Sequence, residues 1–189
     1  MTMKRSSGIL MAVSSLPSPY GIGTLGKAAY EFADFLHDAG QHYWQMLPLG
    51  PTSYGDSPYQ SFSTFAGNPY FIDLDMLIDD GLLKKSEVAK CQWGTEPRYV
   101  DYGKIYESRF QVLETAKKRG WQRDAEAVAA FQQENGRWLE DYALYMACKR
   151  HFGMKSWTEW PDDALRLRKT PEVLEKYRTE LREDVELFI

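Results

Sequence analysis

The sequence predicts an α/β fold, in which a parallel strand–helix–strand unit is followed by a helical segment. Two short apolar runs, at residues 8–13 and 43–47, are typical of buried strands. The residues between them show the three- and four-residue apolar spacing of a helix. After residue 82 charged side chains of both signs are dense, as they are on solvated helices. Short connections between strand, helix and strand imply a right-handed crossover and therefore a parallel pair.

The first helix is expected between the two strands. Thr24 would cap its start by accepting a backbone N–H bond, and Gly40 would take the left-handed conformation just past its end. Its apolar side chains would share one face: Leu25, Ala28, Phe32, Leu36 and Ala39.

Later segments are mostly helical in pattern. Helices are expected at residues 101–119, 125–133, 138–152 and 171–189, and residues 71–74 form a short apolar piece that is strand or extended chain. No third strand is convincing. A closed eight-stranded barrel needs about 200 residues at the least, so this chain does not close one alone.

Charge is distributed unevenly along the chain. Residues 1–81 hold three basic and eight acidic side chains, whereas residues 82–189 hold 20 basic and 19 acidic. We expect an architectural boundary near this shift, with one domain at 1–81 and a helical one at 82–189.

A functional surface is expected where the two strands end. In parallel α/β folds, ligands bind in the loops after the carboxyl ends of the strands, here residues 14–23 and 48–68. The second loop is rich in aromatic residues, including Tyr54, Tyr59, Phe62 and Phe65, with hydroxyl and amide groups between them. Aromatic faces beside polar groups suit a sugar ring, so the sequence predicts a carbohydrate site.

Tyr59 is the strongest candidate for ligand contact. Pro58 fixes the backbone before it, and Ser57 and Gln60 supply hydrogen-bonding groups beside it. The alternative is that the tyrosine ring plugs the strand ends, because aromatic side chains often fill such positions.

Asp56 is the one carboxylate in the aromatic loop. Retaining glycoside chemistry needs two carboxylates about 5–5.5 Å apart, so this loop does not supply a catalytic pair. Asp56 is either a ligand contact or a turn residue between Gly55 and Ser57. Asp73 and Asp75 have a simpler interpretation as solvated or capping residues.

Several function classes are disfavoured by composition. The net charge of −4 gives no basic footprint for nucleic acid. The run at 8–13 is short for a signal peptide, and no segment approaches the ~20 apolar residues of a membrane span. Cys91 and Cys148 are far apart in the sequence and the three histidines are scattered, which favours reduced thiols in a cytoplasmic protein without a metal site. The glycines at 21–26 leave an anion at the next helix start as a minor alternative, because turn and cap roles already account for them.

Several strings of residues resemble the amylomaltases, the 4-α-glucanotransferases of glycoside hydrolase family 77. They are S-G-I-L at 7–10, S-L-P-S-P-Y-G-I-G at 15–23, W-Q-M-L-P-L-G-P at 44–51 and Y-G-D-S-P-Y-Q-S at 54–61. F-A-G-N-P at 65–69 and I-D-L at 72–74 extend the match.

The resemblance implies a (β/α)₈ barrel with helical insertions. Residues 1–81 would then form the first two strands and the active-site loop of a partial TIM barrel, and residues 82–189 a helical insertion subdomain. The family moves α-1,4-glucan segments between maltodextrins by a retaining double displacement and needs no metal or organic cofactor. Its catalytic aspartate and glutamate would lie beyond the end of this chain, so no catalytic residue is expected here.

The resemblance also implies roles for residues of this chain. Tyr59 resembles the tyrosine platform beneath the donor sugar, and Ser57 lies in the same loop. Tyr54 and Tyr106 resemble an accessory glucan site. The string Met11–Ser14 departs from the His-Pro-Thr that family members often have, which leaves contacts from the first loop in doubt.

Two other interpretations stay open. The chain could be a glucan-binding module without catalysis, or an assembly protein whose helical half makes contacts. In the barrel interpretation the remainder of the barrel is needed for a complete fold, so the isolated chain is expected to fold poorly or to self-associate.

Overall fold

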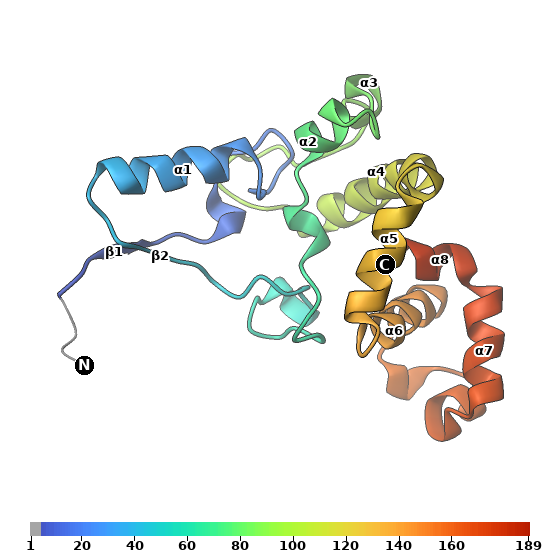
Figure 1. Cartoon of the computed structure of the whole chain (residues 1–189). Coiled ribbons are helices and arrows are strands. Elements are labelled where there is room, and N and C mark those ends of the chain that lie inside the picture. The colour runs from blue at the N-terminus through green and yellow to red at the C-terminus, as the bar shows by residue number, and fades with distance from the viewer. Residues whose placement is uncertain (1–4) are drawn as a thin grey trace. The chain divides into compact units, whose positions relative to one another are not determined.

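The computed structural model describes residues 5–189, which form two compact units. The first unit ends at Ala116 and the second is Lys117–Ile189. Most of the described chain is helical, and its two strands lie in the first unit (Figure 1). The units are described separately below.

The strand–helix–strand prediction is confirmed. β1 (Gly8–Leu10) pairs in parallel with β2 (Tyr43–Gln45), and α1 (Lys27–Asp38) connects them. The register places Ile9 beside Trp44 and Leu10 beside Gln45. Both strands are shorter than the apolar runs that predicted them. The Met11 N–H continues the ladder by donating to the Gln45 carbonyl at 3.0 Å, after which the chain turns into the 3-10 helix η1 (Val13–Ser15).

The first strand is less buried than its apolar run predicts. Trp44 packs edge-on against Phe32 of α1, with ring centroids 4.9 Å apart, so one face of the sheet is covered. Leu10 and Tyr43 lie on the opposite face, because side chains alternate along a strand, and they are 57% and 65% exposed. Within residues 5–189 the sheet has two strands, and this second face remains largely open.

The start of α1 also differs from expectation. Gly26, not Thr24, is the N-cap and makes no side-chain cap bond. The Thr24 hydroxyl instead donates to Asp73 Oδ2 at 2.5 Å. Asp73 Oδ1 accepts the Met76 N–H at 3.0 Å, which caps α2 (Leu74–Asp79). Thr24 therefore forms its hydrogen bond with a carboxylate 49 residues away. The sequence around Thr24 does not indicate this partner.

The predicted apolar face of α1 is confirmed in its central part. Leu36 is buried, and Ala28 and Phe32 pack against the first core, whereas Leu25 precedes the helix and is 44% exposed. Gly40 has a φ of +67°, as predicted for the residue just past the helix end.

The rest of the first unit consists of short helical pieces and one long helix. They are η2 (Tyr54–Asp56), η3 (Pro69–Phe71), α2, α3 (Lys85–Val88) and the first part of α4 (Tyr102–Arg123), whose residues from Lys117 onward belong to the second unit. The expectation of strand or extended chain at 71–74 is confirmed only for Ile72 and Asp73, which are extended, because η3 ends at Phe71 and α2 begins at Leu74. The first core includes Val13, Leu16, Ile22, Ala29, Tyr70, Phe71 and Ile105. A second core includes Leu74, Leu83, Val88, Val112 and Ala116.

The second unit is helical throughout its regular structure. It contains α5 (Ala125–Asn135), α6 (Leu139–His151), η4 (Trp157–Glu159), the π-helix η5 (Ala164–Arg168), α7 (Pro171–Glu180) and α8 (Arg182–Leu187). One final helix was expected at 171–189, but the chain breaks at Leu181, whose φ and ψ are −106° and 24°. Leu181 is buried with Leu144, Cys148 and Tyr177 in the core of this unit.

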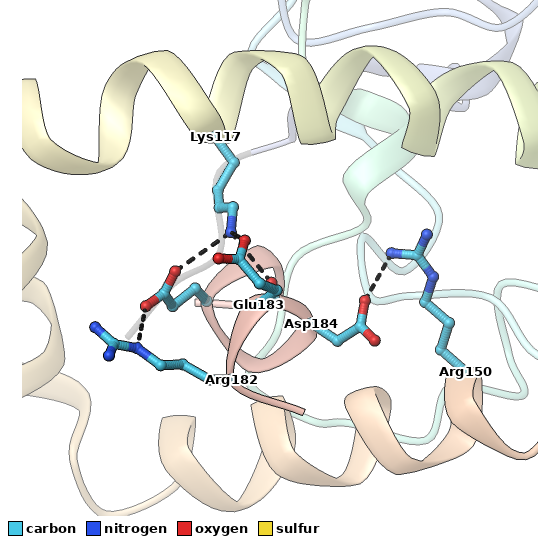
Figure 2. Close-up of polar contacts among 6 residues, drawn as sticks. Lys117, Arg150, Arg182, Glu183 and Asp184 are labelled. Carbon is cyan, nitrogen blue, oxygen red and sulfur yellow. Dashed lines mark hydrogen bonds and ion pairs between the residues drawn. The ribbon is translucent and has the colours of Figure 1, made fainter. Parts of the chain in front are cut away.

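Ion pairs hold α8 in place within the second unit. Figure 2 shows Lys117 reaching from α4 to α8, where its Nζ lies 2.6 Å from Glu183 and 3.3 Å from Glu186. Arg150 of α6 pairs with Asp184 at 3.1 Å. No helix of residues 5–189 is long and apolar enough to cross a membrane.

Candidate carbohydrate site

The loops after the two strands border one hollow in the first unit. Val13 and Ser14 follow β1, Leu49 and Pro58 follow β2, and all four residues line it. The hollow encloses about 80 Å³. Ligand pockets are typically 300–1,000 Å³, so this hollow is smaller than a complete ligand pocket. The strand order therefore brings two segments at least 35 residues apart in sequence, 13–14 and 49–58, to one place.

The aromatic loop is closed at its base by hydrogen bonds. The Asn68 N–H donates to the Leu49 carbonyl at 2.8 Å, which brings the two ends of the loop together. Asn68 Oδ1 accepts the Tyr70 N–H at 3.0 Å and caps η3. Trp44 Nε1 donates to the Met11 carbonyl at 2.8 Å and so links the two strand ends. A loop closed in this way can present its tip residues in a defined place.

Tyr59 lies at the tip of a tight turn and is 72% exposed. The Gln60 N–H donates to the Ser57 carbonyl at 3.2 Å, and the Tyr59 N–H donates to Ser57 Oγ at 3.3 Å. Ser57 therefore shapes the turn with both its backbone and its side chain. The exposure contradicts the alternative in which the Tyr59 ring plugs the strand ends. Gln60 is exposed beside it.

Asp56 lines the hollow and is a turn residue as well. Its φ is +55°, in the left-handed region, and its N–H donates to the Ser53 carbonyl at 3.1 Å. Partial burial raises the pKa of the Asp56 carboxyl. Burial, followed by the Asp56 charge, raises the pKa of Tyr70 and of Tyr102. Asp56 thus faces two phenols and is more easily protonated than an exposed aspartate.

Tyr54 and Tyr106 are the two residues expected at an accessory glucan site. Tyr106, in α4, is partly buried against the first core and packs edge-on against Phe110 at 5.2 Å. Tyr54 begins η2, and its side chain lies outside the described part of the structure.

Sequence reasoning missed Tyr102, Asn68 and Thr52, which line the hollow. Tyr102 comes from the start of α4, 34 residues beyond the end of the aromatic loop at residue 68, and no local pattern marks it. Asn68 precedes Pro69, a turn signal that could have identified it as a loop end.

The anion alternative at the start of α1 is wrong. A Cβ built on Gly26 would lie 2.0 Å from Asp73 Oδ2, so a carboxylate already occupies the N-terminal end of this helix. The capping interpretation of Asp73 is confirmed by its bond to the Met76 N–H. Asp75 accepts a hydrogen bond from the Tyr20 hydroxyl. Among residues 5–189 no group of three or more histidine, cysteine, aspartate or glutamate side chains could hold a metal ion.

Comparison with known proteins points to a single family. The model of the 4-alpha-glucanotransferase family matches residues 11–189. The 4-alpha-glucanotransferase of Streptococcus pneumoniae is 53% identical over 179 residues, which are 94% of this chain and 35% of that protein. The Thermus thermophilus 4-alpha-glucanotransferase is 45% identical over 190 residues, covering 98% of this chain and 36% of that protein.

The same similarity extends to structure. An amylomaltase from Streptococcus agalactiae, solved in complex with acarbose, matches with a TM-score of 0.93 and 44% sequence identity. The match covers 98% of this chain and 37% of that one. The chain therefore spans about a third of the length of the relatives it matches.

Proposed function

Because the chain belongs to the 4-alpha-glucanotransferase family, glycoside hydrolase family 77, we propose that it is the N-terminal part of such an enzyme. The complete enzyme transfers α-1,4-glucan segments between maltodextrins. The observation that supports a sugar site in this chain is Tyr59, a 72% exposed aromatic ring on a loop that is closed at its base. Asp56 and Pro58 of the same loop line the hollow, and Tyr59 itself does not.

In this proposal the strand pair is the start of a (β/α)₈ barrel. Residues 1–81 supply its first two strands and the active-site loop, and residues 82–189 form a helical insertion. The open sheet face with Leu10 and Tyr43 fits a strand pair whose remaining partners belong to a longer protein. The two carboxylates of a retaining mechanism would come from that remainder, so the 189-residue chain alone is inactive.

Each site residue has a proposed role. Tyr59 stacks on the apolar C–H face of a donor sugar, while Asp56 and Gln60 offer hydrogen-bonding groups to its hydroxyls. Ser57 holds the turn that presents Tyr59. Tyr54 and Tyr106 contribute to an accessory glucan contact. The chemistry needs no cofactor, and the free thiols of Cys91 and Cys148 are consistent with a reducing, cytoplasmic location.

The main rival is a glucan-binding module without catalysis. Disproportionation of maltotriose into glucose and longer chains separates the two. The enzyme proposal expects this activity from the longer polypeptide and none from residues 1–189 alone. An assembly role for the helical half is the weaker rival, because the second unit buries its own core of helix side chains.

Substitution of Tyr59 tests the sugar site. The variant Tyr59→Ala is made in the polypeptide that contains the complete site. It is expected to weaken acarbose binding by about 10- to 100-fold, because the loss of one aromatic ring that stacks on a flat ligand costs roughly 1–3 kcal/mol. Tyr59→Phe keeps the ring and should lose far less. Tyr30→Ala, at a 66% exposed tyrosine on α1, is the matched control and should bind normally. Equal affinities for Tyr59→Ala and Tyr30→Ala, measured by calorimetry, would refute the site.

A further inference from the structure

Arg109 is the most deeply buried charged residue in the described chain. It projects from α4 and is 0% exposed. Its Nη1 donates to the Ile72 carbonyl at 2.8 Å, and its guanidinium lies over the Trp93 ring at 5.4 Å from the centroid. A fully buried arginine is unusual and needs a structural reason.

One contact of Arg109 leads to the end of the aromatic loop. Ile72 directly follows Phe71, which lines the hollow together with Asn68. The Phe71 carbonyl also accepts the Leu25 N–H at 2.9 Å, just before α1. The bond from Arg109 to Ile72 therefore fixes the segment that forms one wall of the hollow.

The other contact leads to the loop after β1. Trp93 packs edge-on against Tyr20 at 5.7 Å. Gly21 approaches the Trp93 backbone so closely that a Cβ would lie 1.9 Å from its carbonyl oxygen. Tyr20 and Gly21 belong to the first of the two loops, so one side chain on α4 supports both.

The electrostatics of Arg109 suit a positioning role better than a stabilising one. Burial lowers its pKa to about 10, and the charge of Asp73 opposes that shift. The guanidinium is therefore charged at neutral pH. Its Nε and Nη2 atoms have no hydrogen-bond partner among the described residues. A buried charge with incomplete pairing adds little net stability, and such groups can instead specify one arrangement.

We infer that Arg109 is a positioning residue, which holds the two loops after the strands in the arrangement that binds glucan. The inference rests on the proposed function for the identity of the ligand, but the support of the two loops stands on the contacts alone. Loss of Arg109 should loosen both loops and weaken glucan binding without removing any group that touches the sugar.

Hydrogen exchange in the polypeptide that contains the complete site tests the support of the loops. Arg109→Met should speed exchange of the Gly23, Leu25 and Phe71 amides by about tenfold, since these amides bond within or beside the two loops. Arg109→Lys keeps a cation and a donor and should restore much of the protection. Val112→Ala, one helical turn away, opens a cavity in the second core beside Leu74 and Leu83. This control should speed exchange at Leu82 and Leu83 instead.

A second measurement separates this inference from the proposed function. In the polypeptide with the complete site, Arg109→Met should raise the acarbose Kd and the maltotriose KM about 5- to 10-fold with a smaller change in kcat, and Val112→Ala should not. Unchanged exchange at Gly23, Leu25 and Phe71 in Arg109→Met, or the same exchange pattern in both variants, would overturn the role of Arg109 whatever the ligand is. If the exchange result holds but Tyr59→Ala binds acarbose normally, the loop support stands and the glucan proposal fails.

Discussion

Gly40 ends α1 with a φ of +67°, and no atom lies within 4 Å of the position a Cβ would take. Any cost of Gly40→Ala would therefore come from backbone conformation alone, which for a non-glycine residue in the left-handed region is about 1–2 kcal/mol. Gly67→Ala is the matched control, because Gly67 also has open space around its Cβ position but no positive φ. It should be neutral or stabilising by about 0.4–1 kcal/mol.

Denaturant unfolding of the two glycine variants measures this difference. Gly40→Ala should lower the midpoint and Gly67→Ala should not. A stable Gly40→Ala protein would mean that the end of α1 can adopt another turn, and that the glycine is not required there.

The conformation and exposure of a single residue could be predicted where they depend on its neighbours in the sequence. The left-handed Gly40 follows from its place after a periodic apolar segment. The exposure of Tyr59 fits its setting in a turn of Ser57, Pro58 and Gln60. Thr24 was mispredicted because its partner, Asp73, is 49 residues away. Tyr102 was missed for the same reason, since only the folded chain brings it to the aromatic loop.

Among the helices, α8 is held in the second unit by ion pairs. The hydrogen bond and charge of Lys117 lower the pKa of the Glu183 carboxyl below its ordinary value of 4.5. A lowered folded-state pKa contributes stability that is fully present above the unfolded value and is lost as pH falls through the folded one. Lys117 also pairs with Glu186, and Arg182 lies 2.9 Å from Glu186.

The second unit should therefore lose stability as the pH falls below the ordinary glutamate pKa of 4.5 and through the lower pKa of folded Glu183, and Lys117→Met should flatten that dependence while lowering stability at pH 7. Lys27→Met, which removes an exposed pair with Glu31 on α1, should leave the slope unchanged. Thermal unfolding of the variants and the native chain, followed by circular dichroism across this pH range, tests whether the ion pairs of Lys117 cause the pH dependence. Parallel curves for the native chain and Lys117→Met would show that the pair is not coupled to folding.

Element types were easier to predict than their ends or their burial. The segments that became α1 and α4 were recognised because an amphipathic helix records its buried face in its own sequence. The break at Leu181 is set by packing against α6 and α7, which the sequence does not display. The apolar run at 8–13 predicted a buried strand, but burial depends on neighbours in space, and here α1 covers one face only.

In the molecule as a whole, one face of the two-stranded sheet is apolar and largely exposed to solvent. Leu10 and Tyr43 are exposed on it, and a two-stranded sheet presents unpaired backbone groups at its edges. We expect the 189-residue chain to self-associate through this face. Leu10→Lys should reduce the association measured by light scattering, whereas Leu167→Lys, at a 69% exposed leucine of the second unit, should not. A monomeric chain with a cooperative melt would contradict this expectation.

The structure of the complete polypeptide bound to acarbose tests the central proposal most directly. We expect a sugar ring stacked on Tyr59, with further rings reaching the hollow lined by Asp56 and Asn68. Acarbose bound elsewhere, with the Tyr59 ring uncovered and the hollow unused, would contradict it.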